Sequence, residues 1–115
     1  MPLIKLRSNV SIADDKTTQL MSELSQMLAS ETGKPEQYVM IEVKGDRNML
    51  FGGSPKPLAY VECKSIGLSA AQAKSLSLSI SQLLKTQLAI SADRIYIEFS
   101  NAPAEFWGWN GSTFG

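Results

Sequence analysis

One pattern occurs twice along this chain of 115 residues: a short apolar strand, a helix and a second strand. Residues 2–7 and 38–43 are predicted as the strands of the first unit, and residues 58–64 and 95–99 as those of the second. Parallel strands need a crossover connection, so each unit is predicted to be a right-handed crossover with its helix on the same face. The predicted fold class is α/β (α+β by some schemes), with one four-stranded mixed sheet and two helices on one face.

In each unit, a stretch with helical periodicity lies between the two strands. Asp14 and Asp15 precede the first apolar stripe, which consists of Leu20, Met21, Leu24, Met27 and Leu28, and Gly33 and Pro35 predict its end. Ser69 and Gln72 form a capping-box signature ahead of a second stripe. Residues 75–81 also alternate serine and apolar residues, as a strand would, but the cap and the length of the stripe favour a helix.

The number of layers predicts an oligomer. Residues 38–43 and 95–99 carry apolar or aromatic side chains on both sides, which is typical of strands that are covered on both faces. Two helices cover only one face of the predicted sheet. A second copy of the chain in a closed ring is the simplest cover for the other face, although this count does not fix the number of subunits.

Composition excludes several functions. Eleven basic and eleven acidic residues cancel, so neither nucleic acid nor a membrane is an expected partner. The single cysteine, Cys63, excludes an internal disulfide, and the absence of histidine removes the commonest metal ligand and general base. Neither a metal nor a cofactor is expected. Length and a hydrophobic content of 43% fit one domain over residues 1–115. Without a signal-peptide pattern or a long apolar run, the expected compartment is the cytoplasm.

Pro2 is the candidate for acid–base chemistry. An initiator Met1 followed by a small residue is usually removed, which would leave Pro2 as a free secondary amine. An α-amino group titrates at roughly 8, and burial or a neighbouring cation lowers that pKa. Such a group would be a base poised near neutral pH. The alternative is that Pro2 only begins a strand, where its missing N–H costs nothing.

Seven short motifs add a resemblance. They are Met1-Pro2, Asn9-Val10, residues 32–35 (Thr-Gly-Lys-Pro) with 37–38 (Gln-Tyr), residues 51–54 (Phe-Gly-Gly-Ser), residues 65–67 (Ser-Ile-Gly), residues 93–97 (Asp-Arg-Ile-Tyr-Ile), and residues 108–110 (Gly-Trp-Asn) with 112–114 (Ser-Thr-Phe). On these motifs the chain resembles the macrophage migration inhibitory factor family of the tautomerase superfamily. The resemblance implies a homotrimer whose sheets face a central channel, with a keto–enol tautomerase site at each subunit boundary. It implies phenylpyruvate-like α-keto acids or dopachrome-like compounds as substrates, and so a phenylpyruvate tautomerase.

The same resemblance implies the roles of individual residues. Pro2 corresponds to the catalytic N-terminal proline, and Lys34 to the lysine that binds the substrate carboxylate. The other substrate-binding positions are Ile66 through its backbone, Tyr96 from the adjacent subunit, and Trp109 and Phe114 of the C-terminal segment. The alternatives are a solvated lysine after a helix end for Lys34 and a core aromatic for Tyr96.

Departures from the family pattern are also present. Leu58 and Val61 occupy the places of a Cys-x-x-Cys, so thiol redox activity is not expected. Glu98 replaces an asparagine two residues after Tyr96, and this carboxylate would repel anionic or phenol-bearing substrates. Trp107 replaces a smaller residue and would narrow the pocket mouth, so Glu98 and Trp107 join the candidate substrate-binding residues.

Two functional hypotheses follow from the resemblance. The first is an enzyme, a tautomerase of small aromatic α-keto acids. The second is a cytokine-like module that binds a receptor protein, with secretion in the absence of a signal peptide. Pro2, Lys34 and Tyr96 favour the enzyme, and nothing in the sequence marks a receptor surface.

Overall fold

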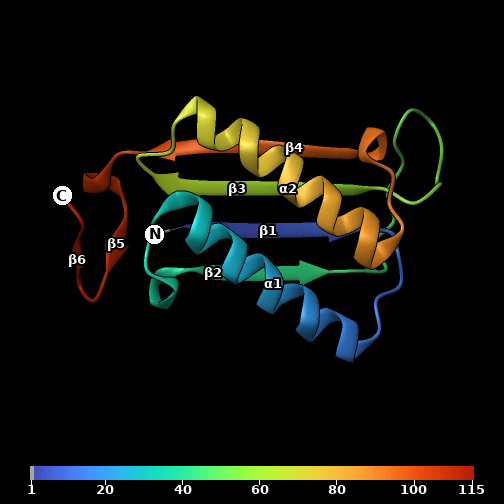
Figure 1. Ribbon diagram of the computed structural model, residues 1–115, viewed down its shortest axis with the longest axis horizontal. Helices are drawn as coiled ribbons and strands as arrows, with labels where there is room; N and C mark the ends of the chain where they lie inside the picture. The colour runs from blue at the N-terminus through green and yellow to red at the C-terminus, as the bar shows by residue number, and fades with distance from the viewer. Residues whose placement is uncertain (1) are drawn as a thin grey trace.

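The computed structural model describes residues 2–115, and its elements follow the predicted order (Figure 1). The strands are β1 (Leu3–Ser8), β2 (Met40–Lys44), β3 (Ala59–Ile66), β4 (Ile95–Ala102), β5 (Gly108–Trp109) and β6 (Ser112–Thr113). The helices are α1 (Asp14–Thr32) and α2 (Ala70–Leu88), with short 3₁₀ helices η1 (Glu36–Tyr38), η2 (Ala92–Arg94) and η3 (Ala104–Phe106).

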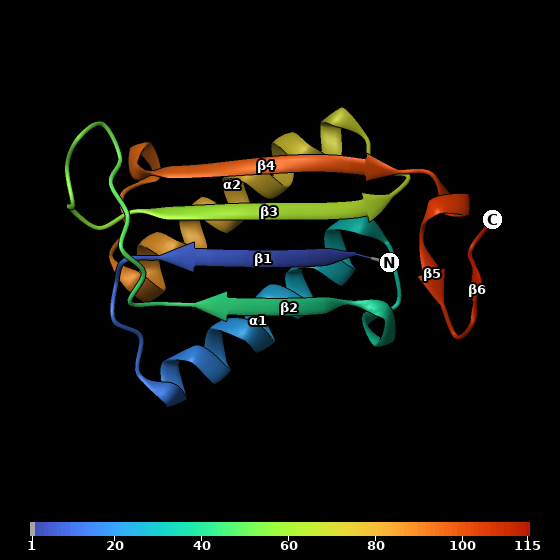
Figure 2. The ribbon, with the colours of Figure 1, turned by 180° about the vertical axis from the view of Figure 1, so that it is seen from behind.

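The main sheet has the strand order β2-β1-β3-β4. β1 is parallel to β2 and β3 is parallel to β4, while the central pair β1 and β3 is antiparallel. Each strand–helix–strand unit is therefore a crossover with parallel strands, as predicted, and the sheet is mixed. Both helices cover the same face of this sheet, in front of it in Figure 1 and behind it in Figure 2.

The ends of the helices lie where the sequence predicts them. Gly33 ends α1 in the left-handed conformation, with φ 70°. The Ser69 side chain accepts a hydrogen bond from the backbone N–H of Gln72, and the Gln72 side chain accepts one from the backbone N–H of Ser69. This capping box fixes the start of α2. Ala13, the N-cap residue of α1, makes no such side-chain bond.

The core lies between the two helices and the covered face of the sheet. Its fully buried side chains include Ile4 and Leu6 of β1, Leu24 and Leu28 of α1, and Leu76, Ile80 and Leu84 of α2. Burial of one such side chain contributes roughly 1.5–3 kcal/mol. Among residues 2–115, no helix is both long and apolar enough to cross a membrane.

The uncovered face of the sheet corrects one prediction. Residues 38–43 and 95–99 were predicted to carry apolar or aromatic side chains on both sides, but most side chains on this face are polar or charged. Its three cross-strand rows are Met40–Leu3–Lys64–Ser100, Glu42–Lys5–Glu62–Glu98 and Lys44–Arg7–Tyr60–Tyr96. Because charged rows tolerate water, the count of layers by itself no longer argues for an oligomer.

Arg94 holds the long loop between β2 and β3. Its guanidinium donates from Nη1 to the Phe51 carbonyl at 2.7 Å and from Nη2 to the Ser54 and Lys56 carbonyls at 2.9 and 3.0 Å. The same group lies 5.0 Å from the centre of the Phe51 ring. One side chain thus closes residues 51–56 into a defined loop.

The C-terminal segment returns to the start of β1. Beyond β4, η3 and the small hairpin β5–β6 lie at the end of the sheet where the chain begins (Figure 1). The backbone N–H of Phe114 donates to the Trp107 carbonyl at 3.2 Å, which closes this segment on itself. Two stretches far apart in sequence, residues 37–40 and the aromatic-rich residues 107–114, are thereby brought close to Pro2.

Candidate active site

Pro2 lies at the first position before β1 and is fully buried. Its carbonyl accepts a hydrogen bond from the backbone N–H of Met40 at 3.0 Å, so the start of β1 is tied to the start of β2. The backbone of Pro2 is therefore fixed by pairing within the sheet. The predicted removal of Met1 concerns a residue outside the described range.

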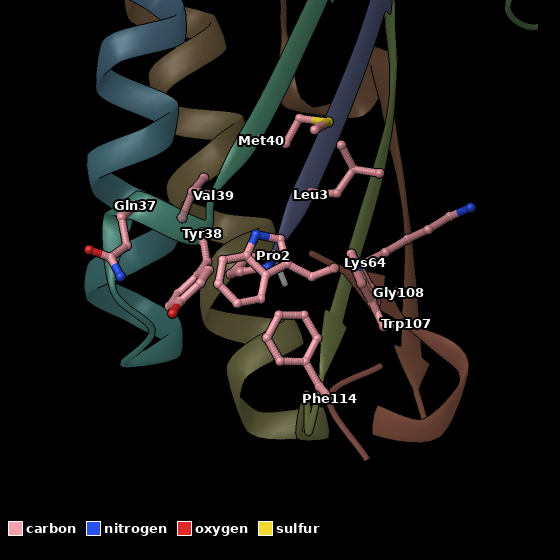
Figure 3. Close-up of a pocket in the computed structure, with 11 residues that line it drawn as sticks. Pro2, Leu3, Gln37, Tyr38, Val39, Met40, Lys64, Trp107, Gly108 and Phe114 are labelled. Carbon is pink, nitrogen blue, oxygen red and sulfur yellow. The ribbon is translucent and has the colours of Figure 1, made fainter. Parts of the chain in front are cut away.

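A cavity of about 490 Å³ opens beside Pro2 (Figure 3). Residues 37–40, which join η1 to β2, form one side, and Lys64 of β3 lies on another. Trp107, Trp109 and Phe114 of the C-terminal segment complete the lining. The cavity is thus built from parts of the chain that only the folded sheet brings together.

Three aromatic rings form one wall. The Trp109 and Phe114 rings are stacked, with centroids 5.7 Å apart and an interplanar angle of 13°. Tyr38 meets both edge-on, at 5.3 Å from Trp109 and 6.0 Å from Phe114. Such edge-to-face and stacked contacts stabilise a fixed arrangement of rings. The wall therefore presents a largely apolar surface to a ligand that enters beside Pro2.

Lys64 is the one charged side chain that lines the cavity among residues 2–115. It lies directly opposite Leu3 in the β1–β3 register, next to the position of Pro2. Its ammonium end points away from the aromatic rings in Figure 3. A lysine side chain has four rotatable bonds, so a carboxylate in the cavity lies within its reach.

The structure brings half of the predicted site residues together. Pro2, Trp107, Trp109 and Phe114 line the cavity, and Lys34, Ile66, Tyr96 and Glu98 do not. Phe106, the bulky neighbour of Trp107, is 83% exposed and outside the lining.

Lys34 and Ile66 lie at the same end of the molecule as Pro2. Lys34 follows the last turn of α1, on the connection to η1, and is half-buried. Ile66 is the last residue of β3, two positions beyond Lys64 on the same side of the strand. Neither residue lines the cavity in this single chain.

Tyr96 and Glu98 lie far from Pro2. Ser100 is level with Lys64 and Leu3 across the sheet, and Tyr96 is four residues back along β4. At about 3.3 Å per residue, this places Tyr96 roughly 13 Å away along the strand, and two strands across. Its ring contacts the Phe51 ring instead, with centroids 4.5 Å apart. Tyr96 and Pro2 of one chain therefore cannot share one pocket.

Glu98 has a partner of its own. Its carboxylate accepts a hydrogen bond from the Tyr60 hydroxyl at 2.7 Å, and Glu62 lies at 3.4 Å from the same hydroxyl. The bond to Glu98, followed by desolvation and the negative charges of both glutamates, raises the pKa of Tyr60 to about 12. Glu98 thus belongs to a carboxylate–phenol cluster in the middle of the uncovered face.

The sequence reasoning missed three lining residues that carry polar side chains, Gln37, Tyr38 and Lys64. Tyr38 was predicted in the second strand, but it ends η1, and this turn swings its ring towards Trp109. Lys64 was predicted on the third strand without a role. The alternation of β3 puts it on the uncovered face, and the pairing with Leu3 brings it beside Pro2. The motif around residue 38 was an available signal for Tyr38. The position of Lys64 could be found only from the strand order.

Comparisons with known proteins identify the family and the fold of the chain. A family model described as macrophage migration inhibitory factor (MIF) matches residues 1–115. The chain belongs to the MIF family. A macrophage migration inhibitory factor of Meriones unguiculatus is 43% identical over 115 residues, which cover 99% of both chains. The crystal structure of a MIF homologue from Prochlorococcus marinus superposes with a TM-score of 0.92 at 44% identity, covering 98% of this chain and 99% of that one. The MIF of Trichinella spiralis gives 0.90 at 32% identity, over 97% and 99%.

Proposed function

We propose that this MIF-family chain is a keto–enol tautomerase of phenylpyruvate-like α-keto acids. The observation that carries the proposal is the position of Pro2, buried at a strand start and facing a cavity with an aromatic wall. A phenyl ring fits the wall of Trp109, Phe114 and Tyr38, which leaves the keto acid end of the substrate towards Pro2 and the lysines. Dopachrome-like compounds, which are also flat and carry a carboxylate, are a second substrate class for the same cavity.

In this proposal the nitrogen of Pro2 is the acid–base group, once Met1 has been removed. The free amine takes a proton from the carbon between the ring and the keto group, and a proton from solvent adds to the keto oxygen to give the enol. The protonated Pro2 then returns a proton to solvent, so the amine is regenerated and the net reaction moves one hydrogen from carbon to oxygen. The reverse steps return the keto form. Burial lowers the pKa of an amine, which keeps a fraction of Pro2 neutral and reactive near pH 7.

Cations at the same end of the molecule support binding of the carboxylate. Lys34 is the residue that the family resemblance implies, and Lys64 is the one that lines the cavity. A positive charge near the amine also disfavours its protonated form. Apolar walls strengthen both effects, because they exclude water from the space between the charges.

A homotrimer with shared sites is part of this proposal. Tyr96 lies roughly 13 Å along the sheet from the level of Leu3, and Pro2 is one residue further away, so the assignment of Tyr96 to the pocket requires a second chain. It is 66% exposed, which leaves its ring accessible to such a neighbour. The receptor-binding role stays an alternative prediction, and no feature of residues 2–115 favours it over the pocket chemistry.

The direct test is Pro2→Ala with phenylpyruvate as substrate. Loss of a positioned acid–base group lowers the rate by roughly two to four orders of magnitude. Pro57→Ala, at an exposed proline beside the long loop, is the matched control and should keep full activity. Intact mass must first show that Met1 is absent from each variant.

Two outcomes would contradict the proposal. Near-normal turnover by Pro2→Ala with a free alanine terminus would place the base elsewhere. Wild-type protein that retains Met1 and still tautomerises phenylpyruvate would exclude the secondary amine, since Pro2 would then be an amide.

A further inference from the structure

Three cations gather on the uncovered face, at the end of the sheet away from Pro2. Arg7 of β1 and Lys44 of β2 are directly opposite each other in the parallel register. Arg47, in the turn that follows β2, joins them around a shallow cavity of about 470 Å³. Asn48, Met49 and Tyr60 complete its lining. This cationic cluster, Arg7, Lys44 and Arg47, has no part in the proposed tautomerase pocket.

The backbone holds these three residues in place. The Arg47 N–H donates to the Ser8 carbonyl and the Asp46 N–H to the Val10 carbonyl, both at 3.0 Å, so the turn is pinned to the end of β1. Gly45 allows the close approach, because a Cβ there would lie 2.7 Å from the Val10 oxygen. Arg7 and Lys44 lie within paired strands. The cluster is therefore preorganised at its backbone.

The surrounding charges do not neutralise the cluster. In the neighbouring row Lys5 lies between Glu42 and Glu62, so charges there alternate across the strands. In the cluster, by contrast, like charges face each other, which destabilises a sheet. Lys44 reaches the Glu42 carboxylate only at 4.0 Å, and this is the single ion pair within residues 2–115. Arg7 and Arg47 have no carboxylate partner within that range.

We propose that this cationic cluster binds a small tetrahedral oxyanion, a phosphate or a sulfate, either free or as the terminal group of a small ester. The guanidinium forks of Arg7 and Arg47 match two oxygens of such a group, and Lys44 supplies a further charge. The Asn48 amide adds a neutral donor at the rim. Bound anion would remove the repulsion between Arg7 and Lys44.

A small anion fits the cluster better than a long polyanion. The cations converge on one cavity and do not extend along a strip, and the next row on the sheet carries three glutamates. A phosphate chain would meet those carboxylates after one or two groups. The net charge of zero also provides no general attraction for nucleic acid.

The test is calorimetric titration of the intact protein with inorganic phosphate, inorganic sulfate and phenyl phosphate, with acetate as the control anion. We expect one site per chain. Charge-assisted hydrogen bonds are lost in Arg7→Gln and Arg47→Gln, so each should weaken binding about tenfold or more. Arg7→Lys keeps the charge without the fork and should bind with intermediate affinity. Lys85→Gln, which removes an exposed cation from α2, should bind as the wild type does.

The outcomes separate the sources of the anion. Tighter binding of phenyl phosphate identifies an ester as the ligand, and equal or tighter binding of inorganic phosphate identifies the free ion. Absence of binding by all three anions would overturn the proposal, and would point to a carboxylate of a neighbouring copy as the occupant. Equal weakening in Lys85→Gln and Arg7→Gln would also overturn it, because the effect would then be one of overall charge. Circular dichroism of each variant shows that the fold is intact.

Discussion

Two lysines are candidates for binding the substrate carboxylate in the proposed reaction. Lys34 is implied by the family resemblance, whereas Lys64 lines the cavity. We expect Lys34→Ala to raise KM for phenylpyruvate with little change in kcat, since a carboxylate is held equally in the ground and transition states. If Lys64 shares the role, Lys64→Ala will raise KM as well. Steady-state kinetics of both single variants and the double variant measure the two shares.

A methyl ester of the same substrate is the control for this comparison. The ester has no carboxylate, so its KM should not respond to either substitution. A pure kcat loss with the acid would contradict a binding role and assign the lysine to the pKa of Pro2 or to the developing enolate.

Cys63 should be inert in the folded protein. Its side chain is fully buried in the core, and burial raises the pKa of its thiol from 9.0 to about 11. A shift of this size lowers the thiolate fraction near neutral pH by about a hundredfold. We expect negligible reaction with a thiol-specific disulfide reagent at pH 8, and complete reaction after unfolding in guanidinium. Fast labelling of the native protein would show that the core opens.

The raised pKa of the Cys63 thiol also makes the free energy of unfolding depend on pH. Between pH 9 and 11 the unfolded chain releases the Cys63 proton while the folded chain retains it, so the free energy of unfolding falls as the pH rises. Cys63→Ala should reduce this slope. The difference between the two proteins isolates Cys63, because Tyr60, whose pKa is raised from 10.0 to about 12, adds the same slope to both.

At the scale of single residues, the sequence predicted those site residues that a short motif identifies by itself. Pro2, Trp109 and Phe114 were named from short motifs, and the cavity contains them. Lys64 could not be named, because its place beside Pro2 depends on β3 pairing with β1 and not with β2. Tyr96 could not be placed relative to Pro2 either, since that distance is a property of the sheet.

The caps of the two helices give an element-scale prediction. Ser69→Ala removes a capping-box acceptor and should lower the free energy of unfolding by about 1 kcal/mol. Ser91→Ala is the matched control, because Ser91 precedes η2 without a side-chain cap bond. Ala13→Ser supplies a missing acceptor at the start of α1 and should have the opposite sign. Chemical denaturation measures all three. Equal effects at Ser69 and Ser91 would contradict the cap argument.

Periodicity located the helices more reliably than it assigned the faces of the strands. Gly33 and the Ser69–Gln72 pair mark backbone events that a single residue type favours, and both are confirmed. The predicted start of β2 was wrong because η1 takes up Tyr38, so the strand begins at Met40. An error of this kind changes which side chains belong to the strand, and it made the uncovered face look more apolar than it is.

The oligomer can be tested with two inactive chains. Pro2→Ala loses the proposed base and Tyr96→Ala loses the wall that the proposal takes from a neighbour. After joint unfolding and reassembly, some mixed trimers would contain pockets with both residues intact, so activity should partly return. Either variant reassembled with itself is the control and should stay inactive.

Measuring the mass of the reassembled protein shows whether mixed trimers have formed, which is needed to interpret the activity. Baseline activity in proven mixed trimers would defeat the shared site, and a stable monomer by light scattering at micromolar concentration would defeat the trimer itself. The fold of one chain was predictable from its own pattern, but the association of chains was not, because the uncovered face is polar enough to remain in water.

The Arg94 side chain has a consequence for how such a chain changes in evolution. It fastens residues 51–56 from within, and the Phe51 and Ser54 backbones bond each other in both directions at 3.1 Å. Gly52 and Gly53, with φ 60° and 75°, therefore form a tight turn that other residues rarely adopt. Changes of loop length across descendants of the sequence should fall outside residues 51–54, while the two glycines and the arginine that fastens the loop remain unchanged.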